Sequence, residues 1–290
     1  MDQPTARRRA DMRQWPFYDE NLMVGPPACS ERDFIRPLLR RCPFDLNTIS
    51  WIARLGGGLD GFAWKVMFGD QGPFVLKVVH TEPPTTFGFY YAAQRESMNA
   101  ALLEKIEAAV SHDTETLPIR VHAEPRTPDD ALDNLLALST EDRQSQLVKD
   151  ADAVEISSIP RMKKCFRWLK IDGEQLCNLH RRLRSVVVKL RNIEDRQIFP
   201  DRKYFSIVYE YIPEGDNYMG QMQLVLDFLW RAGFVFRQSL RKENWKSGVL
   251  VDLSDVISPG GHNWHKNAYR RTDASFPVPA DALIFPWYRR

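Results

Sequence analysis

A glycine-rich segment is the most informative part of this sequence: Leu55-Gly56-Gly57-Gly58-Leu59-Asp60-Gly61-Phe62-Ala63-Trp64-Lys65-Val66. It contains the pattern G-x-G-x-x-G at Gly56, Gly58 and Gly61, between two predicted strands. Glycines allow a tight turn and let the backbone approach phosphate oxygens, because no Cβ stands in the way. We therefore expect these three glycines to contact a ligand. The same pattern also fits an ordinary hairpin turn.

The regions on either side of this segment predict a mixture of strands and helices. Strands are expected over 50–55, 63–68 and 73–79, separated by turns that contain glycine. An alanine-rich stretch of strong helix formers predicts a helix over 89–110. Further strands rich in β-branched and aromatic residues are expected over 161–170, 185–191, 204–211 and 248–252. An amphipathic helix over 218–232 should end at Gly233. This pattern predicts an α+β fold.

Two regions depart from this pattern. Residues 1–45 are rich in proline and arginine, which predicts a loosely held basic arm with one short helix over 31–41. Residues 111–155 are acidic and poor in aromatics, which predicts an insertion or flexible loop with a helical patch over 128–138. We therefore divide the chain into an arm (1–45), an N-terminal lobe that carries the acidic insertion (46–215) and a short C-terminal lobe with a basic, aromatic tail (216–290).

Composition narrows the class of protein. The 290 residues are 43% hydrophobic and 27% charged with a net charge of +2, which excludes disorder over the whole chain and coiled coils. None of the four cysteines forms a C-x-x-C pair, so reduced thiols in the cytoplasm are expected. No membrane helix, secretory signal or metal site is predicted.

A lysine within an apolar strand is a second candidate ligand-binding residue, in addition to the glycines. Lys77 lies in Phe74-Val75-Leu76-Lys77-Val78, where an unpaired charge is unfavourable, and Glu96 follows nineteen residues later in the predicted helix. This arrangement of glycine loop, strand lysine and helix glutamate resembles the N-terminal lobe of protein kinases, in which lysine and glutamate pair to hold ATP phosphates. The alternative is a lysine on an edge strand that reaches water and a surface glutamate.

The second half of the chain continues this resemblance. Glu214 and Asp216 follow the strand over 204–211 in a hinge-like segment, where they are expected to contact a ligand. Residues 237–244 align with the kinase catalytic loop, and the metal-ligand types of that family are kept at Asn244 and Asp252. Ser239 replaces the catalytic aspartate and cannot accept a proton as a carboxylate does. Only 38 residues follow Asp252. The resemblance therefore implies a protein-kinase-like two-lobed fold with a shortened C-terminal lobe, without protein kinase activity.

The segment Asn244-Trp245-Lys246-Ser247-Gly248-Val249-Leu250-Val251-Asp252-Leu253-Ser254 is similar to a group of fungal kinase-like proteins labelled as a Sim4-associated kinetochore subunit family. The chain also resembles the arginine-containing cyclodipeptide synthases, which join arginine from arginyl-tRNA to a second amino acid in natural-product biosynthesis. The D-x-x-E pattern of that family occurs once, at Asp152 and Glu155. The alternative is that these two residues are simply the solvated edge of an acidic insertion.

This resemblance implies a tRNA-dependent cyclodipeptide synthase that requires no cofactor. In that enzyme Lys77, Glu96, Asn244 and Asp252 would be catalytic, together with Ser239, Asp152 and Glu155. The alternatives are a catalytically inactive kinase-like binding or scaffold protein and an ATP-dependent small-molecule kinase. ATP and Mg²⁺ are expected to bind if the kinase-like cleft is retained.

An aminoacyl-tRNA partner requires a basic surface, and several basic groups are available for phosphate contacts. Trp264 and Tyr269 lie near the last of these groups, where aromatic rings could stack on unpaired bases. The alternative is a solvated basic face with aromatic residues that pack on the core. The candidate nucleic-acid-binding residues are Arg181, Arg182, Arg184, Lys189, Arg191, Arg270 and Arg271.

Overall fold

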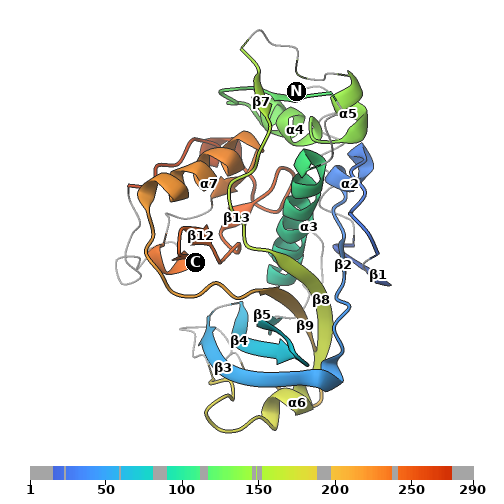
Figure 1. Cartoon of the computed structure of the whole chain (residues 1–290), viewed down its shortest axis with the longest axis vertical. Helices are drawn as coiled ribbons and strands as arrows, with labels where there is room; N and C mark the ends of the chain where they lie inside the picture. Colours follow the sequence, from blue (N-terminus) through green and yellow to red (C-terminus); the bar gives the residue numbers. More distant parts are fainter. Residues whose placement is uncertain are drawn as a thin grey trace.

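A computed structural model of the chain describes residues 16–22, 24–58, 60–80, 90–111, 117–145, 148, 152–187, 197–236 and 241–275. These residues form a mixed α+β structure, as the sequence predicts (Figure 1). A seven-stranded sheet occupies one end of the molecule, and most of the helices lie beyond one of its faces. No helix among the described residues combines the length and apolar character needed to cross a membrane.

The large sheet has the strand order β1-β2-β8-β9-β5-β4-β3. Neighbouring strands from β8 to β3 are antiparallel, whereas β1 pairs with β2 and β2 with β8 in parallel. The strands are β1 (Tyr18–Leu22), β2 (Leu39–Arg41), β3 (Ile49–Gly57), β4 (Gly61–Phe68), β5 (Gln71–Val79), β8 (Cys165–Asp172) and β9 (Lys203–Glu210).

Alternation along the strands determines which side chains each face of the sheet buries. Phe62, Trp64 and Val66 of β4 join one core cluster, which also packs against the short helix α6 (Gly173–Cys177). The opposite face packs against the long helix α3 (Ala92–Ser111), through small residues such as Ala93. Small side chains let this helix lie close to the strands.

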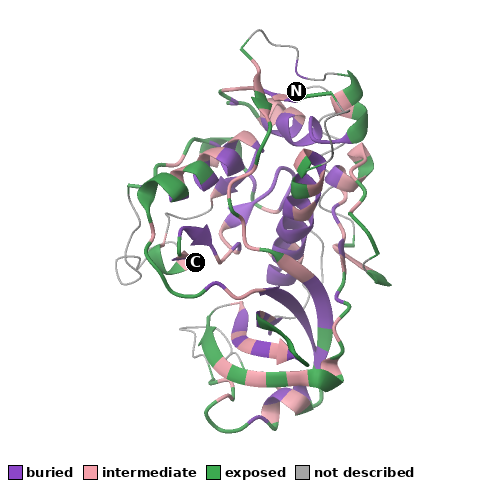
Figure 2. Ribbon diagram, in the orientation of Figure 1, coloured by how far each residue is buried: buried purple, intermediate pink, exposed green. Residues whose placement is uncertain are grey.

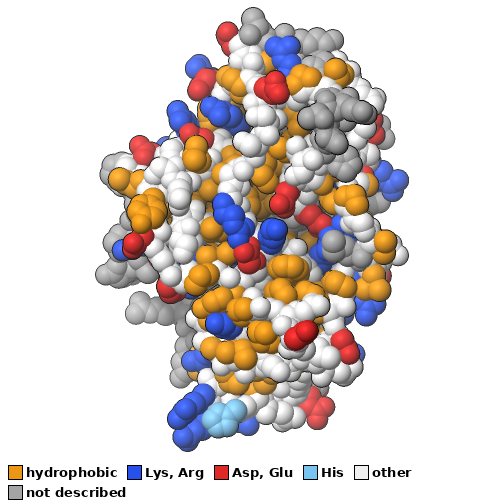
Figure 3. All heavy atoms as spheres, in the orientation of Figure 1, with side chains coloured by type: hydrophobic (Ala, Val, Ile, Leu, Met, Phe, Trp, Pro, Cys, Tyr) orange, Lys and Arg blue, Asp and Glu red, His pale blue; other side chains and the backbone are white. Residues whose placement is uncertain are grey.

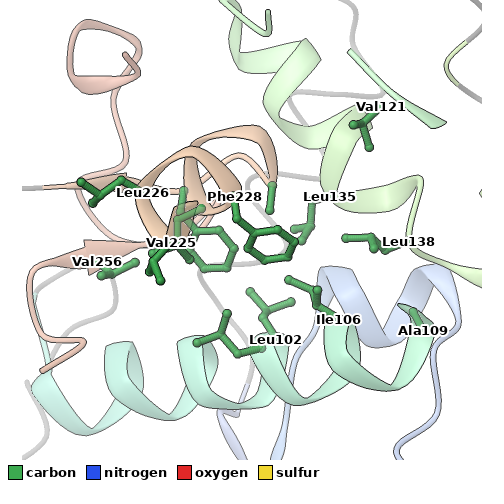
Figure 4. Packing of buried hydrophobic residues seen from close by; sticks show 14 of the residues in the cluster. Leu102, Ile106, Ala109, Val121, Leu135, Leu138, Val225, Leu226, Phe228 and Val256 are labelled. Carbon is green, nitrogen blue, oxygen red and sulfur yellow. The ribbon is translucent and has the colours of Figure 1, made fainter. Parts of the chain in front are cut away.

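Helix α3 also belongs to a second core. Its C-terminal half carries Leu102 and Ile106, which pack against α7 (Met219–Arg231) and α4 (Pro128–Leu136) (Figure 4). Leu102 and Ile106 are both 0% exposed, and truncating such a side chain to alanine typically costs about 2–5 kcal/mol. One helix therefore joins the sheet to the helical part of the molecule (Figure 2).

Helix α7 ends where the sequence predicts. Gly233 follows it with φ +87, a left-handed conformation that favours glycine. A Cβ at this position would also lie 2.3 Å from the carbonyl oxygen of Ala131. Both requirements explain why glycine stands here. The smaller elements near α7 are β10 (Val235–Phe236), β11 (Trp245–Lys246), β12 (Val249–Leu250), β13 (Val256–Ile257) and the 3₁₀ turns Leu46–Thr48, Lys242–Asn244 and Lys266–Ala268.

The N-terminal region differs from the loosely held arm that the sequence predicts. From residue 16 onward, β1 and β2 extend the large sheet, and the predicted 31–41 helix is only α2 (Glu31–Ile35). Ser30 and Asp33 form a capping box at its start. Phe34 and Leu39 are both 0% exposed, so this region belongs to the folded core. Residues 1–15 lie outside the described residues.

The acidic segment 111–155 also contains ordered structure. The predicted helical patch is α4, which is followed by α5 (Thr140–Ser145), and β6 (Ile119–Val121) pairs with β7 (Val154–Ile156). Leu132 and Leu135 of α4 lie in the same core as α7, so this part is not a solvated loop. The acidic residues suggested a solvated loop, but Asp130 belongs to the capping box at the start of α4. Its carboxylate accepts hydrogen bonds from the backbone N–H groups of Arg126 and Thr127.

The strand predicted over 185–191 is wrong where the structure describes it. Residues 185–187 are not in a strand, and Val186 and Val187 are about half exposed. The preceding turn is held instead by side chains that donate to its carbonyl groups. Trp64 Nε1 donates to the Leu183 oxygen at 2.7 Å, and Arg54 Nη1 donates to the Arg184 oxygen at 2.9 Å.

Candidate functional site

Strand β5 and helix α3 bring Lys77 and Glu96 together. Lys77 points to the face of the sheet that α3 covers, because Leu76 and Val78 point to the opposite face. Glu96 lies near the start of α3 and is buried at 1% side-chain exposure. Lys77 Nζ lies 2.6 Å from Glu96 Oε1. The predicted lysine–glutamate pair is therefore present, and the surface alternative is wrong for both residues.

Asp252 completes this arrangement from the other part of the chain. Its Oδ1 lies 3.0 Å from Lys77 Nζ and accepts a hydrogen bond from the Ser254 backbone N–H at 3.0 Å. The Asp252 side chain is 36% exposed, whereas the Lys77 side chain is 17% exposed. The carboxylate of Asp252 is therefore the most accessible charged group of the three. Residues 77, 96 and 252 thus form a single charged site.

The charges in this site stabilise one another. Burial opposes the ionisation of Asp252, but Lys77, the Ser254 N–H and Lys163 outweigh it and hold the Asp252 pKa well below its ordinary range. Burial also opposes the charge on Lys77, yet the carboxylates of Asp252 and Glu96 keep the Lys77 pKa above its ordinary value. Asp252 is therefore an anion and Lys77 a cation at neutral pH.

Lys163 is a member of this site that the sequence analysis missed. Its Nζ lies 3.5 Å from the centroid of the Tyr209 ring and donates to the Val251 carbonyl oxygen. Burial and repulsion by Lys77 lower the Lys163 pKa from 10.5 to about 8. The sequence gives no signal for this role, because Lys163 precedes a strand as one of two adjacent lysines. We call Lys77, Glu96, Asp252 and Lys163 the charge cluster.

Helix α3 holds the Asp252 segment through two further residues that the sequence analysis did not single out. Asn99 is 0% exposed, and its Nδ2 donates to the carbonyl oxygens of Leu253 at 3.2 Å and Val256 at 2.7 Å. Arg95 donates to the Ser254 carbonyl oxygen at 3.0 Å. The helix that carries Glu96 therefore also fixes the backbone beside Asp252.

The glycine turn between β3 and β4 has two different kinds of glycine. The space around Gly56 and Gly58 is open within 4 Å of an added Cβ, so both positions leave room for a ligand. Gly61 instead lies against β5, where a Cβ would be 2.2 Å from the Val78 carbonyl oxygen. Gly61 is thus required for strand packing. The Tyr90 hydroxyl anchors the turn by donating to Asp60 Oδ2 at 2.6 Å.

The remaining positions expected from the kinase resemblance lie before and after α7 in the sequence. The Asn244 carbonyl oxygen accepts from the Val251 N–H at 2.8 Å, which places Asn244 beside the strand that leads to Asp252. Glu214 is 79% exposed and pairs with Lys246, and Asp216 is exposed. Within the part of the chain that the structure describes, no ion pair or hydrogen bond joins Glu214 or Asp216 to the charge cluster. Ser239 lies outside the described residues.

Asp152 and Glu155 lie in a different part of the molecule. Glu155 is on β7, opposite Arg120 of β6, and both acidic residues are exposed. The small β6–β7 sheet is at the end of the molecule opposite β3 and β4 (Figure 1). The structure therefore places the D-x-x-E pattern away from the charge cluster. The chain that leads from α3 to β7 first folds into β6, α4 and α5.

Arg181, Arg182 and Arg184 are exposed in the turn after α6. Lys and Arg side chains gather at this end of the molecule (Figure 3). Arg54 of β3 is also exposed and adds a fourth arginine to this group, which the spacing in sequence could not indicate. Lys189 and Arg191 lie outside the described residues.

The predicted basic and aromatic group near the end of the chain is only partly accessible to a nucleic acid. Arg270 is exposed, whereas Arg271 is paired with Asp227 of α7 at 2.6 Å. Trp264 and Tyr269 are 8% and 6% exposed, and they donate to the carbonyl oxygens of Gly233 and Trp230. The prediction that these two rings stack on bases is therefore wrong, since both are core residues that close the end of α7.

Comparison of the chain with protein-family models and with curated protein sequences finds no match. The site combines a buried lysine–glutamate pair, an accessible carboxylate and a second lysine with a lowered pKa, together with an open glycine turn on β3 and β4.

Proposed function

We propose that this chain has a protein-kinase-like two-lobed fold with a shortened C-terminal lobe. In this interpretation the large sheet and α3 form the first lobe, and α7 with β10–β13 forms the second. The convergence of Lys77, Glu96 and Asp252 is the observation that carries the proposal. These residues come from a strand, a helix and a loop far apart in the sequence, in the order that the resemblance implies.

We infer that the charge cluster is the reaction centre of an acyl transferase of the arginine-containing cyclodipeptide synthase type. Such an enzyme joins an arginyl group, delivered on tRNA, to a second amino acid. The aminoacyl ester is already activated, so the protein must align an amine with the ester carbonyl. The amide bond forms as the ester C–O bond breaks, and the proton lost by the amine goes to the departing ribose hydroxyl of the tRNA. The ionised, accessible carboxylate of Asp252 is suited to holding the ammonium or guanidinium group of the arginyl substrate.

Two features support acyl transfer over phosphoryl transfer to a hydroxyl group. Ser239 occupies the position of the kinase catalytic aspartate, so the proton acceptor of that reaction is missing. The exposed arginines after α6, together with Arg54, provide a basic surface for phosphates of RNA. The proposal does not use Asp152 or Glu155, because both lie away from the charge cluster.

A catalytically inactive nucleotide-binding protein is the second candidate. Lys77 is the residue type that contacts nucleotide phosphates, and the open space at Gly56 and Gly58 leaves room for them. Asp252 and Asn244 are residue types that hold Mg²⁺ through oxygen atoms. In this case the molecule would act as a scaffold, and ATP would bind without being consumed.

The test is expression of the full chain in a host that makes no such metabolites, followed by mass spectrometry of the extract. We expect a new arginine-containing cyclic dipeptide, lost in Asp252→Asn and retained in Asp201→Asn, a matched change at an exposed turn residue. Thermal unfolding would verify that both variants fold.

A second measurement separates the two candidates. If the folded wild-type chain makes no cyclic dipeptide, the synthase proposal fails. Calorimetric binding of ATP with Mg²⁺, lost in Lys77→Met, would then support the nucleotide-binding protein. The absence of both the product and nucleotide binding would refute the assignment of this cluster as a functional site.

A further inference from the structure

A cavity of about 540 Å³ lies between α3 and the start of β8. This volume falls within the range of about 300–1,000 Å³ that is typical of sites for small organic ligands. Most of its surface is apolar, and aromatic rings form one part of the wall. The lining residues that matter here are Phe44, Phe74, Leu103, Met162, Phe166 and Leu253. An apolar ligand of moderate size would be well covered in this space.

Lys163 brings a positive charge to the wall of this cavity. Its Nζ contacts the Tyr209 ring and the Val251 carbonyl oxygen, and no carboxylate in the described part of the chain lies within ion-pair distance of it. The cavity wall also contains Glu104, but that carboxylate is already paired with Arg167 and Arg40. Lys164 and the exposed Glu107 complete its charged residues. The Lys163 ammonium is therefore the cation best placed to receive an anionic group from a ligand.

The cavity also adjoins the charge cluster. Tyr209, which lines it, donates its hydroxyl to Glu96 Oε2 at 3.4 Å. Leu253, another lining residue, directly follows Asp252, and Asn99 of α3 holds its carbonyl group. A molecule in the cavity would thus contact Tyr209 and Leu253, which adjoin Glu96 and Asp252 of the charge cluster.

We propose that this cavity binds an organic acid with an apolar body, either an aromatic or a branched aliphatic carboxylate. The apolar body packs among Phe44, Phe166 and Met162, and the carboxylate pairs with Lys163. Apolar burial supplies most of the affinity, and the charged hydrogen bond fixes the orientation. Lys163 belongs to both sites, but binding of an acid in the cavity requires neither RNA nor a nucleotide, so it can be measured separately from the reaction proposed above.

The test is calorimetry on the full chain at pH 7 with two probes, indole-3-propionate and the uncharged 3-methylindole. We expect both to bind the wild-type protein, with indole-3-propionate tighter. Lys163→Met should weaken indole-3-propionate binding by about tenfold or more, because a charged hydrogen bond is lost. The same change should leave 3-methylindole binding unaltered. Lys266→Met is the matched control, because this exposed lysine is not part of the cavity wall.

A variant that fills the cavity tests the apolar half of the proposal. Met162→Trp should abolish the binding of both probes, while thermal unfolding shows that the protein still folds. Equal binding of indole-3-propionate by wild type and Lys163→Met would refute the role of the cation. If neither probe binds the wild-type chain at millimolar concentration, or if both bind Met162→Trp as well as wild type, the cavity is not the site.

Discussion

Replacement of Lys163 by methionine is expected to stabilise the protein at neutral pH. Lys163 is a partly buried cation without a carboxylate in ion-pair distance among the described residues. Methionine has a similar length and no charge, so it can fill the same space without the penalty of burying an ammonium group. A stabilising change at a residue of the candidate site is an unusual result, which makes the prediction discriminating.

The magnitude follows from the Lys163 pKa. That pKa falls from 10.5 to about 8, and each pKa unit corresponds to about 1.4 kcal/mol, so the charge destabilises the folded state by about 3 kcal/mol. Methionine loses the contact with the Tyr209 ring and leaves the Val251 carbonyl without its donor, which together cost about 1–2 kcal/mol. We therefore expect a net gain of about 1–2 kcal/mol at pH 7, a rise in Tm of about 2–6 °C.

The pH dependence provides an internal check. Because the folded-state pKa lies below the unfolded one, both states hold the proton below pH 8 and the penalty is complete there. Between pH 8 and 10.5 the unfolded state binds more protons, so the wild-type protein gains stability as pH rises. The groups that act on Lys163 are Lys77 of β5, Glu96 of α3, Asp252 and Cys165. The advantage of methionine should shrink by about 2 kcal/mol between pH 7 and pH 9.5.

Urea unfolding of wild type and Lys163→Met at both pH values measures this effect. Lys164→Met serves as the control, because that exposed lysine should change stability little at either pH. A Lys163→Met protein that is less stable than wild type at pH 7, or whose difference from wild type does not vary with pH, would show that Lys163 is not a destabilising cation.

Further predictions concern the other residues of the site. Wild type should lose stability in urea titrations as pH falls below about 4, because a carboxylate with a lowered pKa stabilises the fold only while it is ionised. Asp252→Asn should make this loss smaller, and an unchanged acid profile would contradict the prediction. Gly61→Ala should destabilise the protein by more than about 1 kcal/mol, since the added Cβ would lie 2.2 Å from a backbone oxygen. Gly56→Ala should be tolerated, because the space around Gly56 is open. Equal unfolding midpoints for the two variants would refute this distinction. Asn99→Leu should cost about 1–3 kcal/mol, because the carbonyl groups of Leu253 and Val256 lose their bonds from the Asn99 side chain. Native-state hydrogen exchange should then increase around residue 256, and unchanged exchange there would refute the role of Asn99 in holding this segment.

The local elements of the sheet could be predicted because their signals are local. The alternation of apolar residues over β4 and β5 and the helix formers of α3 determine which backbone groups pair and which face is buried. The pairing of Lys77 with Glu96 followed from the same elements, since a charge inside an apolar strand requires a partner. Within this hairpin and this helix, the local sequence was sufficient to predict both the elements and the Lys77–Glu96 pair.

Other features depended on contacts between distant parts of the chain. The sequence alone determined the α+β composition, the strands from β3 to β5, helix α3, the end of α7 at Gly233 and the need to pair Lys77. Only the tertiary structure decided that Leu39 joins the sheet, that α4 packs on α7, that Trp264 is a core residue and that Lys163 enters the charge cluster. Backbone pairing and amphipathic faces depend on neighbouring residues, whereas burial of a particular lysine or tryptophan depends on which distant surface covers it. A single sequence does not specify that surface until the chain has folded.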